Sequence, residues 1–97
     1  MTYSMTDAIP FLDQEEKVCS WVFHFNAMED DVTAHTDIIV EMDVDRKPLP
    51  DWKKEEVIKI SKMAEENQNV KQQLANHIKN IKAQPKRAGN FNFKEME

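Results

Sequence analysis

Two histidines and an aspartate come closest to a chemical site in this sequence. His24, His35 and Asp37 lie in two neighbouring segments that alternate apolar and polar residues, as β-strands do. Two imidazoles and a carboxylate on one polar sheet face could bind a divalent metal ion or act as an acid–base pair. An exposed sheet face is not a pocket, so we expect ordinary cross-strand polar pairs here. A small metal-dependent or acid–base enzyme is kept as an alternative hypothesis.

Other catalytic signatures are absent from the sequence. Gly89 is the only glycine, which excludes the glycine-rich loops that bind dinucleotides and nucleoside phosphates. Cys19 is the only cysteine, so neither an intrachain disulfide nor a cysteine-pair zinc site can form. We interpret Cys19 as a small buried hydrophobic residue rather than a nucleophile. The sequence therefore predicts a protein that is not an enzyme and that uses no cofactor.

Carboxylates gather in the first half of the chain. Side chains two residues apart on one strand lie about 6.7 Å from each other, so acidic residues at that spacing form a strip of negative charge. Such a strip can simply keep a sheet edge from aggregating, or it can dock a basic partner, including one that normally grips nucleic acid. The residues of this acidic strip are Asp30, Asp31, Asp37, Glu41, Asp43 and Asp45.

Two segments, residues 17–28 and 32–45, predict an antiparallel hairpin. Apolar residues occupy mainly the odd positions of the first segment and the even positions of the second. Side chains directly opposite each other must share a face, and a two-residue turn at Asp30 and Asp31 satisfies that requirement. The resulting register pairs Trp21 with Val40, Phe23 with Ile38, Cys19 with Met42, His24 with Asp37, and Asn26 with His35.

Residues 51–84 form the predicted helical region. Asp51 is a suitable N-cap, and Pro85 would end the helical pattern. One helix over 52–84 would be about 50 Å long, whereas a compact domain of this size is about 30–35 Å across. We therefore favour a break near residues 67–69, because asparagine is a good helix-stop residue; the alternative is that the far half packs on another subunit. The apolar stripe comprises Val57, Ile60, Met63, Ala64, Val70, Leu74, Ile78 and Ile81.

The apolar stripe has two interpretations. It can cover the aromatic face of the hairpin in the same chain, which is the common arrangement in small domains. Alternatively, its second half can act as a short coiled-coil seam and make the protein a homodimer. The oligomer or partner face would then consist of Val70, Leu74, Ile78 and Ile81.

The remaining segments complete a single α+β domain over residues 1–97. Residues 1–16 predict an extended arm, because Pro10 interrupts their apolar residues. Residues 85–97 predict either a tail or a third strand, because Phe91 and Phe93 alternate with polar residues and a lone hairpin is marginally stable. The predicted fold is an antiparallel hairpin packed against one long or two shorter C-terminal helices.

Charge is unevenly divided along the chain. The net charge of −5 separates into −9 for residues 1–51 and +4 for residues 52–97. The acidic half disfavours direct binding to nucleic acid and to anionic membranes. Cations near a helix C-terminus complement the helix dipole, although a nucleic-acid binder is kept as a further alternative. These cations are Lys71, Lys79, Lys82, Lys86 and Arg87.

The sequence as a whole favours a binding protein. Its single cysteine, the lack of a signal peptide at the N-terminus and the lack of an apolar run of about 20 residues predict a cytoplasmic protein that does not enter a membrane. We therefore expect a non-catalytic accessory or inhibitor module that binds another protein through its acidic sheet face and helical surface. The partner would be basic or nucleic-acid-binding, or a second copy of this chain.

Overall fold

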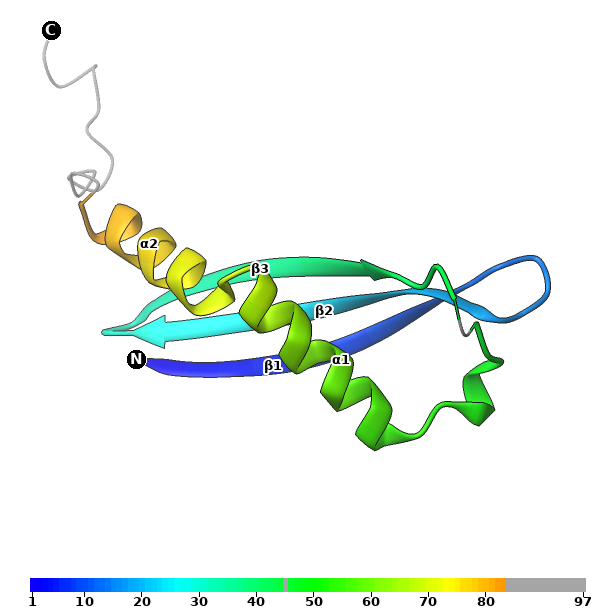
Figure 1. The fold of residues 1–97 in the computed structure, drawn as a ribbon. Helices are drawn as coiled ribbons and strands as arrows, with labels where there is room; N and C mark the ends of the chain where they lie inside the picture. The colour runs from blue at the N-terminus through cyan, green and yellow to red at the C-terminus, as the bar shows by residue number, and fades with distance from the viewer. Residues whose placement is uncertain (45, 84–97) are drawn as a thin grey trace, which may run out of the picture.

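A three-stranded antiparallel sheet with two helices on one of its faces makes up the fold (Figure 1). The computed structural model describes residues 1–44 and 46–83. The elements are β1 (Thr2–Leu12), β2 (Val18–Glu29), β3 (Val32–Glu41), a 3-10 turn η1 (Leu49–Asp51), α1 (Lys54–Asn67) and α2 (Val70–Ala83). The sheet order is β1-β2-β3, so both β1 and β3 are edge strands. The predicted α+β class is confirmed.

The β2–β3 hairpin has the predicted register. Trp21 lies opposite Val40 and His24 lies opposite Asp37. Asp30 and Asp31 have φ angles of 49° and 66°, which makes the turn a two-residue type with both central residues left-handed. That geometry matches the right-handed twist of the flanking strands. Strand β3 nevertheless ends at Glu41, so the predicted range 32–45 was too long, and residue 45 lies outside the described residues.

The third strand is N-terminal. Residues 1–16 were predicted as an arm, but Thr2–Leu12 pairs with β2 as an 11-residue strand. A register shift between Met5 and Asp7 moves the half-buried positions from odd residues to even ones, which hides the strand periodicity. Pro10 is tolerated because β1 is an edge strand. The predicted tail strand, residues 85–97, lies outside the described residues.

The helical region breaks where it was predicted to break. Helix α1 ends at Asn67 and α2 begins at Val70. Between them Asn69 has a φ of 50°, the left-handed conformation that commonly stops a helix. The amide of Gln68 donates to the carbonyl of Ala64 at 3.0 Å and closes the last turn of α1. The break therefore divides the helical region into two helices of 14 residues each.

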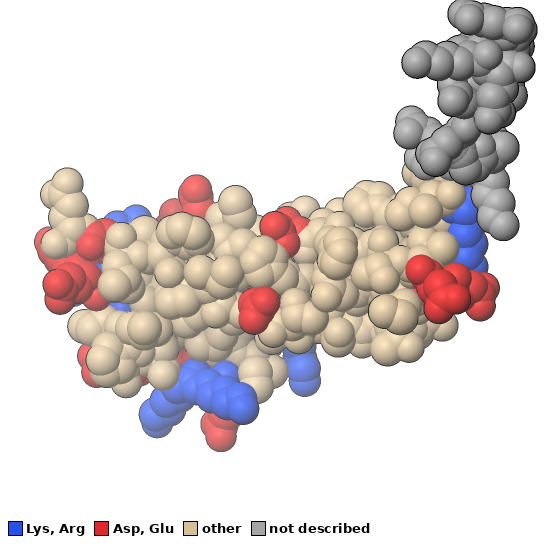
Figure 2. Space-filling view, turned by 180° about the vertical axis from the view of Figure 1, so that it is seen from behind, with Lys and Arg blue, Asp and Glu red and all other residues tan. Residues whose placement is uncertain are grey.

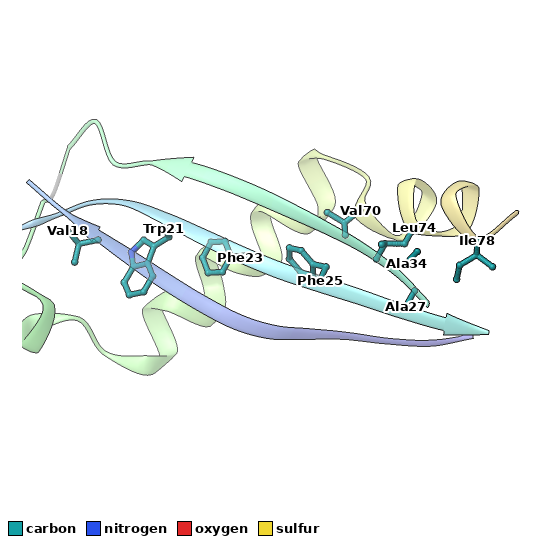
Figure 3. Packing of buried hydrophobic residues seen from close by; sticks show 9 residues of the cluster. All are labelled: Val18, Trp21, Phe23, Phe25, Ala27, Ala34, Val70, Leu74 and Ile78. Carbon is teal, nitrogen blue, oxygen red and sulfur yellow. The ribbon is translucent and has the colours of Figure 1, made fainter. Parts of the chain in front are cut away.

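The core lies between the sheet and the helices. Val70, Leu74 and Ile78 are directed from α2 toward the sheet (Figure 3) and are 0–1% exposed. The stripe therefore packs on its own sheet, and the assignment of these three residues to an oligomer or partner face is corrected. Ile81 alone of that set keeps substantial exposure, 42%. The sheet side of the core comprises Val18, Trp21, Phe23, Phe25, Ala27 and Ala34.

Helix α1 packs more loosely than α2. Only Ser61 and Ala64 are buried in it. Its N-terminal end is fixed by Trp52, whose ring meets that of Trp21 edge-on with centroids 5.6 Å apart. The indole N–H of Trp52 donates to the carbonyl of Lys47 at 3.1 Å. The loose packing of α1 leaves a groove along β3, described below.

Candidate functional site

One face of the sheet is uncovered by any element of the described chain. The strand registers place every second side chain on this face, away from the helices. Figure 2 views the molecule from that side. We call this surface the open face; its residues are Thr2, Ser4, Asp7, Ile9 and Phe11 from β1, Ser20, Val22, His24, Asn26 and Met28 from β2, and Thr33, His35, Asp37, Ile39 and Glu41 from β3.

Apolar side chains form a connected part of the open face. The registers align Ile9, Val22 and Ile39 in one row across all three strands. Ile39 is 65% exposed and the neighbouring Phe11 is 50% exposed. Exposed sheet faces usually carry polar residues, so a contiguous apolar row points to a surface that binds something.

The open face carries carboxylates and no lysine or arginine. The three strands contain no lysine or arginine at any position. Figure 2 shows a mostly uncharged surface with separate acidic groups, while Lys and Arg side chains lie at its margins. The carboxylates of this face are Asp7, Asp37 and Glu41, and the remaining surface is apolar or neutral. The electrostatic potential here therefore favours a positively charged partner.

The histidines form the predicted cross-strand pairs. His24 Nδ1 hydrogen-bonds to Asp37 Oδ1, and Asp7 lies opposite His24 from the other side. His35 Nδ1 lies 2.6 Å from Asn26 Oδ1, one row away. Within residues 1–44 and 46–83, no three His, Cys, Asp or Glu side chains are placed to hold a metal ion. The candidate set His24, His35 and Asp37 is thus divided between two polar pairs.

The acidic strip has one part that contacts α2 and another part that is exposed to solvent. Lys82 of α2 contacts Asp30 at 2.9 Å and Glu29 at 3.3 Å, which joins the hairpin tip to the last helical turn. The hydrogen bond from Lys82 lowers the pKa of Asp30, and the same contact raises the pKa of Lys82. Farther along the strip, Glu41 and Asp43 are exposed, and Asp45 lies outside the described residues.

A groove of about 500 Å³ lies between the end of β3 and α1. One wall is the run Ile38–Val44, and the other includes Ile60, Met63 and Ala64 of α1. Met63 is 55% exposed and Val44 is 71% exposed, so apolar surface remains accessible in and beside the groove. Sequence reasoning missed the groove, because it depends on how tightly α1 packs, which periodicity does not indicate.

Two basic residues of the helical region, Lys71 and Lys82, take part in contacts within the chain. Lys71 Nζ lies 5.2 Å above the Tyr3 ring and 3.8 Å from Glu65, and Lys82 binds the hairpin tip. Burial and the nearby Glu65 carboxylate raise the pKa of the Tyr3 phenol. Lys86 and Arg87 lie outside the described residues. The basic stretch at the end of the helical region is thus partly occupied by structural roles.

Cys19 is half-buried rather than buried as predicted. Its thiol lies 3.3 Å from the carbonyl oxygen of Phe11. A second register irregularity between Phe11 and Leu12 places Val18, instead of Cys19, in the core.

In comparisons with known proteins, no family model, curated protein or solved structure matches the chain. Among the described residues, neither helix combines the length and apolar character that crossing a membrane requires.

Proposed function

We propose that this protein is a non-catalytic binding module, an accessory or inhibitor of another protein, that acts through the open face and the adjoining acidic strip. The supporting observation is that the helices cover one face of the sheet, while the other exposes an apolar row beside carboxylates and without a lysine or arginine (Figure 2). Exposure of an apolar row to water is unfavourable in free energy, and binding to a partner surface would bury the row.

The partner should be basic and partly apolar. Carboxylates at the rim of an interface steer an oppositely charged partner and raise the association rate, whereas the apolar row supplies burial. A protein that normally grips nucleic acid has both properties. The single cysteine suits a reducing compartment, so we place this interaction in the cytoplasm.

The test begins with affinity capture from the native host to supply a partner, followed by stopped-flow association. The Glu41→Gln/Asp43→Asn variant should slow association at low salt and weaken its salt dependence, because rim charges act mainly on the on-rate. Each substitution should change stability by no more than about 0.5 kcal/mol, since both side chains are exposed.

A matched control makes the same change of charge elsewhere. Glu55→Gln/Glu66→Gln neutralises two exposed carboxylates of α1, on the covered side of the sheet. We expect this control to associate much like the wild type. Equal on-rates for the strip variant and the wild type at low salt would contradict the proposed role of the strip.

A further inference from the structure

Within residues 1–44 and 46–83, no strand pairs with the outer edge of β3. The amide of Met42 donates to the carbonyl of Cys19 at 2.8 Å, on the side of β2. The register is uninterrupted along β3, and alternate residues of an antiparallel strand direct their N–H and C=O groups to opposite sides. Ile39 and Glu41 therefore direct theirs away from β2, where the described chain supplies no further strand. Such an edge is a template for strand addition.

The groove lies directly beside this edge. Residues Ile38–Val44 form its strand wall and Met63 stands on the opposite, helical wall. A strand laid along β3 would direct every second side chain toward the helices and into the groove. Most of the groove lining on the helical side is apolar, with Ile60, Met63 and Ala64 beside the polar Asn67 and Gln68. Methionine adapts to differently shaped apolar groups. The side chains of an added strand that enter the groove should therefore be apolar.

The alternate side chains of an added strand, which point away from the groove, would face carboxylates. Its remaining side chains would lie on the open face, beside Asp37 and Glu41. Asp43, two residues past the end of β3, is also exposed. Opposite charges at directly facing strand positions stabilise a pair, and like charges destabilise it. The side chains of the added strand that lie on the open face should therefore be lysine or arginine.

We propose that the edge of β3 binds an extended segment of the partner as a fourth strand, and that this segment alternates apolar residues with lysine or arginine. This proposal rests on the proposed function and names the binding mode and the chemistry of the partner. A second copy of the chain fits poorly, because antiparallel β3–β3 pairing centred on Ile39 would set Asp37 of each copy against Glu41 of the other.

A synthetic peptide tests the chemistry. An acetylated, amidated peptide of about nine residues that alternates isoleucine and lysine would cover the edge from Ile38 past Met42. We expect it to bind, with NMR shifts at residues 38–44 and at Ile60 and Met63. A peptide that alternates isoleucine and glutamate should bind at least about tenfold more weakly. Equal binding of the two peptides, or no binding of the lysine peptide, would overturn the proposal.

Backbone methylation of the peptide tests the mode. In an added strand, one alternate set of amides donates to β3 and the other set faces solvent. N-methylation of one set should abolish binding, and N-methylation of the other should leave affinity within about threefold. The sensitive set is that of the lysines if the segment runs antiparallel to β3, and that of the isoleucines if it runs parallel. Equal effects of both sets would overturn strand addition.

A pair of variants of the protein tests strand addition at the β3 edge instead of in the peptide. Ile39→Pro removes an outward N–H, and proline is tolerated on edge strands. Ile39→Thr removes the same exposed apolar side chain and keeps the N–H. We expect Ile39→Pro to bind the lysine peptide about tenfold more weakly than Ile39→Thr does. Equal affinities of the two folded variants would contradict the proposal, and the methylated peptides decide if the proline variant does not fold.

The outcomes also separate this inference from the proposed function. If both methylated peptides bind like the parent while Glu41→Gln/Asp43→Asn still slows partner association, the open face binds without strand addition. The inference is then wrong and the proposed function stands. If the strip variant and the wild type associate equally with the partner, the proposed function fails as well.

Discussion

Lys82 joins the last turn of α2 to the tip of the β2–β3 hairpin. Its ammonium group contacts Asp30 and Glu29 at the hairpin tip. A cation in the last turn of a helix also complements the helix dipole. The hydrogen bond from Lys82 lowers the folded-state pKa of Asp30 below its ordinary 3.8. Its stabilising effect is therefore present above that ordinary value and is lost as the pH falls through the lowered pKa.

The Asp30→Asn variant should lose less stability than the wild type between about pH 5 and pH 2, because its tip no longer has a carboxylate to protonate. Asp31→Asn is the matched control: it lies next in the same turn, also with a positive φ, and asparagine tolerates that conformation. Urea unfolding at several pH values measures the slopes. Parallel acid limbs for the wild type and Asp30→Asn would show that the Lys82 contact does not act on stability.

Phe23 is the clearest core residue of the sheet. It is 0% exposed, in the central strand, and its truncation leaves a cavity that both neighbouring strands and the helices enclose. We expect Phe23→Ala to lower the free energy of unfolding by about 3–5 kcal/mol. Ile39→Thr on the open face should change it by no more than about 0.5 kcal/mol. Near wild-type stability of Phe23→Ala in chemical denaturation would contradict this core.

The cross-strand pairs show what residue patterns can predict. Alternation fixed which side chains of β2 and β3 share a face, and a two-residue turn left one register compatible with that alternation. The predicted pairing of His24 with Asp37 is therefore confirmed. The same reasoning could not place Asp7 beside them, because a bulge in β1 shifts its register by one residue.

At the scale of elements, the helix break was predicted correctly, whereas strand β1 was missed. The break was predicted because asparagine adopts the left-handed conformation more readily than most residues do, and Asn69 has a φ of 50°. Strand β1 was missed because its half-buried residues, Tyr3 and Met5 and then Ala8 and Pro10, do not keep one parity. A change of parity around a short polar pair, Thr6 and Asp7, is the signal that a bulged strand leaves in a sequence.

Asn69 also gives the prediction for the helix break. Asn69→Ala should lower the free energy of unfolding by about 1 kcal/mol, because a β-carbon without a compensating polar group disfavours the left-handed conformation. Asn69→Gly should stay within about 0.5 kcal/mol of the wild type, since the ease of positive φ is offset by greater unfolded-state entropy. Gln68→Ala, with a right-handed backbone, is the control. Equal costs for the two alanine variants in thermal unfolding would contradict the role of the conformation.

At the scale of the molecule, the shape explains why the compactness estimate was wrong. The structure measures 64 × 28 × 18 Å, whereas a compact domain of this length is about 30–35 Å across. Twelve-residue β2 alone spans about 40 Å. The two helices lie on one side of the sheet only (Figure 1), which leaves the opposite side of the sheet as the open face.

The whole-molecule prediction concerns whether α2 stabilises one chain or joins two. Leu74 is 0% exposed within a single chain, so Leu74→Ala should lower the free energy of unfolding by about 2–5 kcal/mol. If α2 joined two copies, its contribution would instead depend on protein concentration by mass action.

We therefore expect the thermal midpoints of the wild type and of Leu74→Ala to differ by the same amount at about 1 µM and at about 100 µM, with no drift of either midpoint. Ile81→Ala, at the exposed end of the same stripe, is the matched control and should cost much less. A midpoint of the wild type that rises with concentration, and that stops rising in Leu74→Ala, would assign this stripe to an interface between copies. Burial of Leu74 under its own sheet argues for the first result, because a side chain that is already fully covered has no surface left for a second copy.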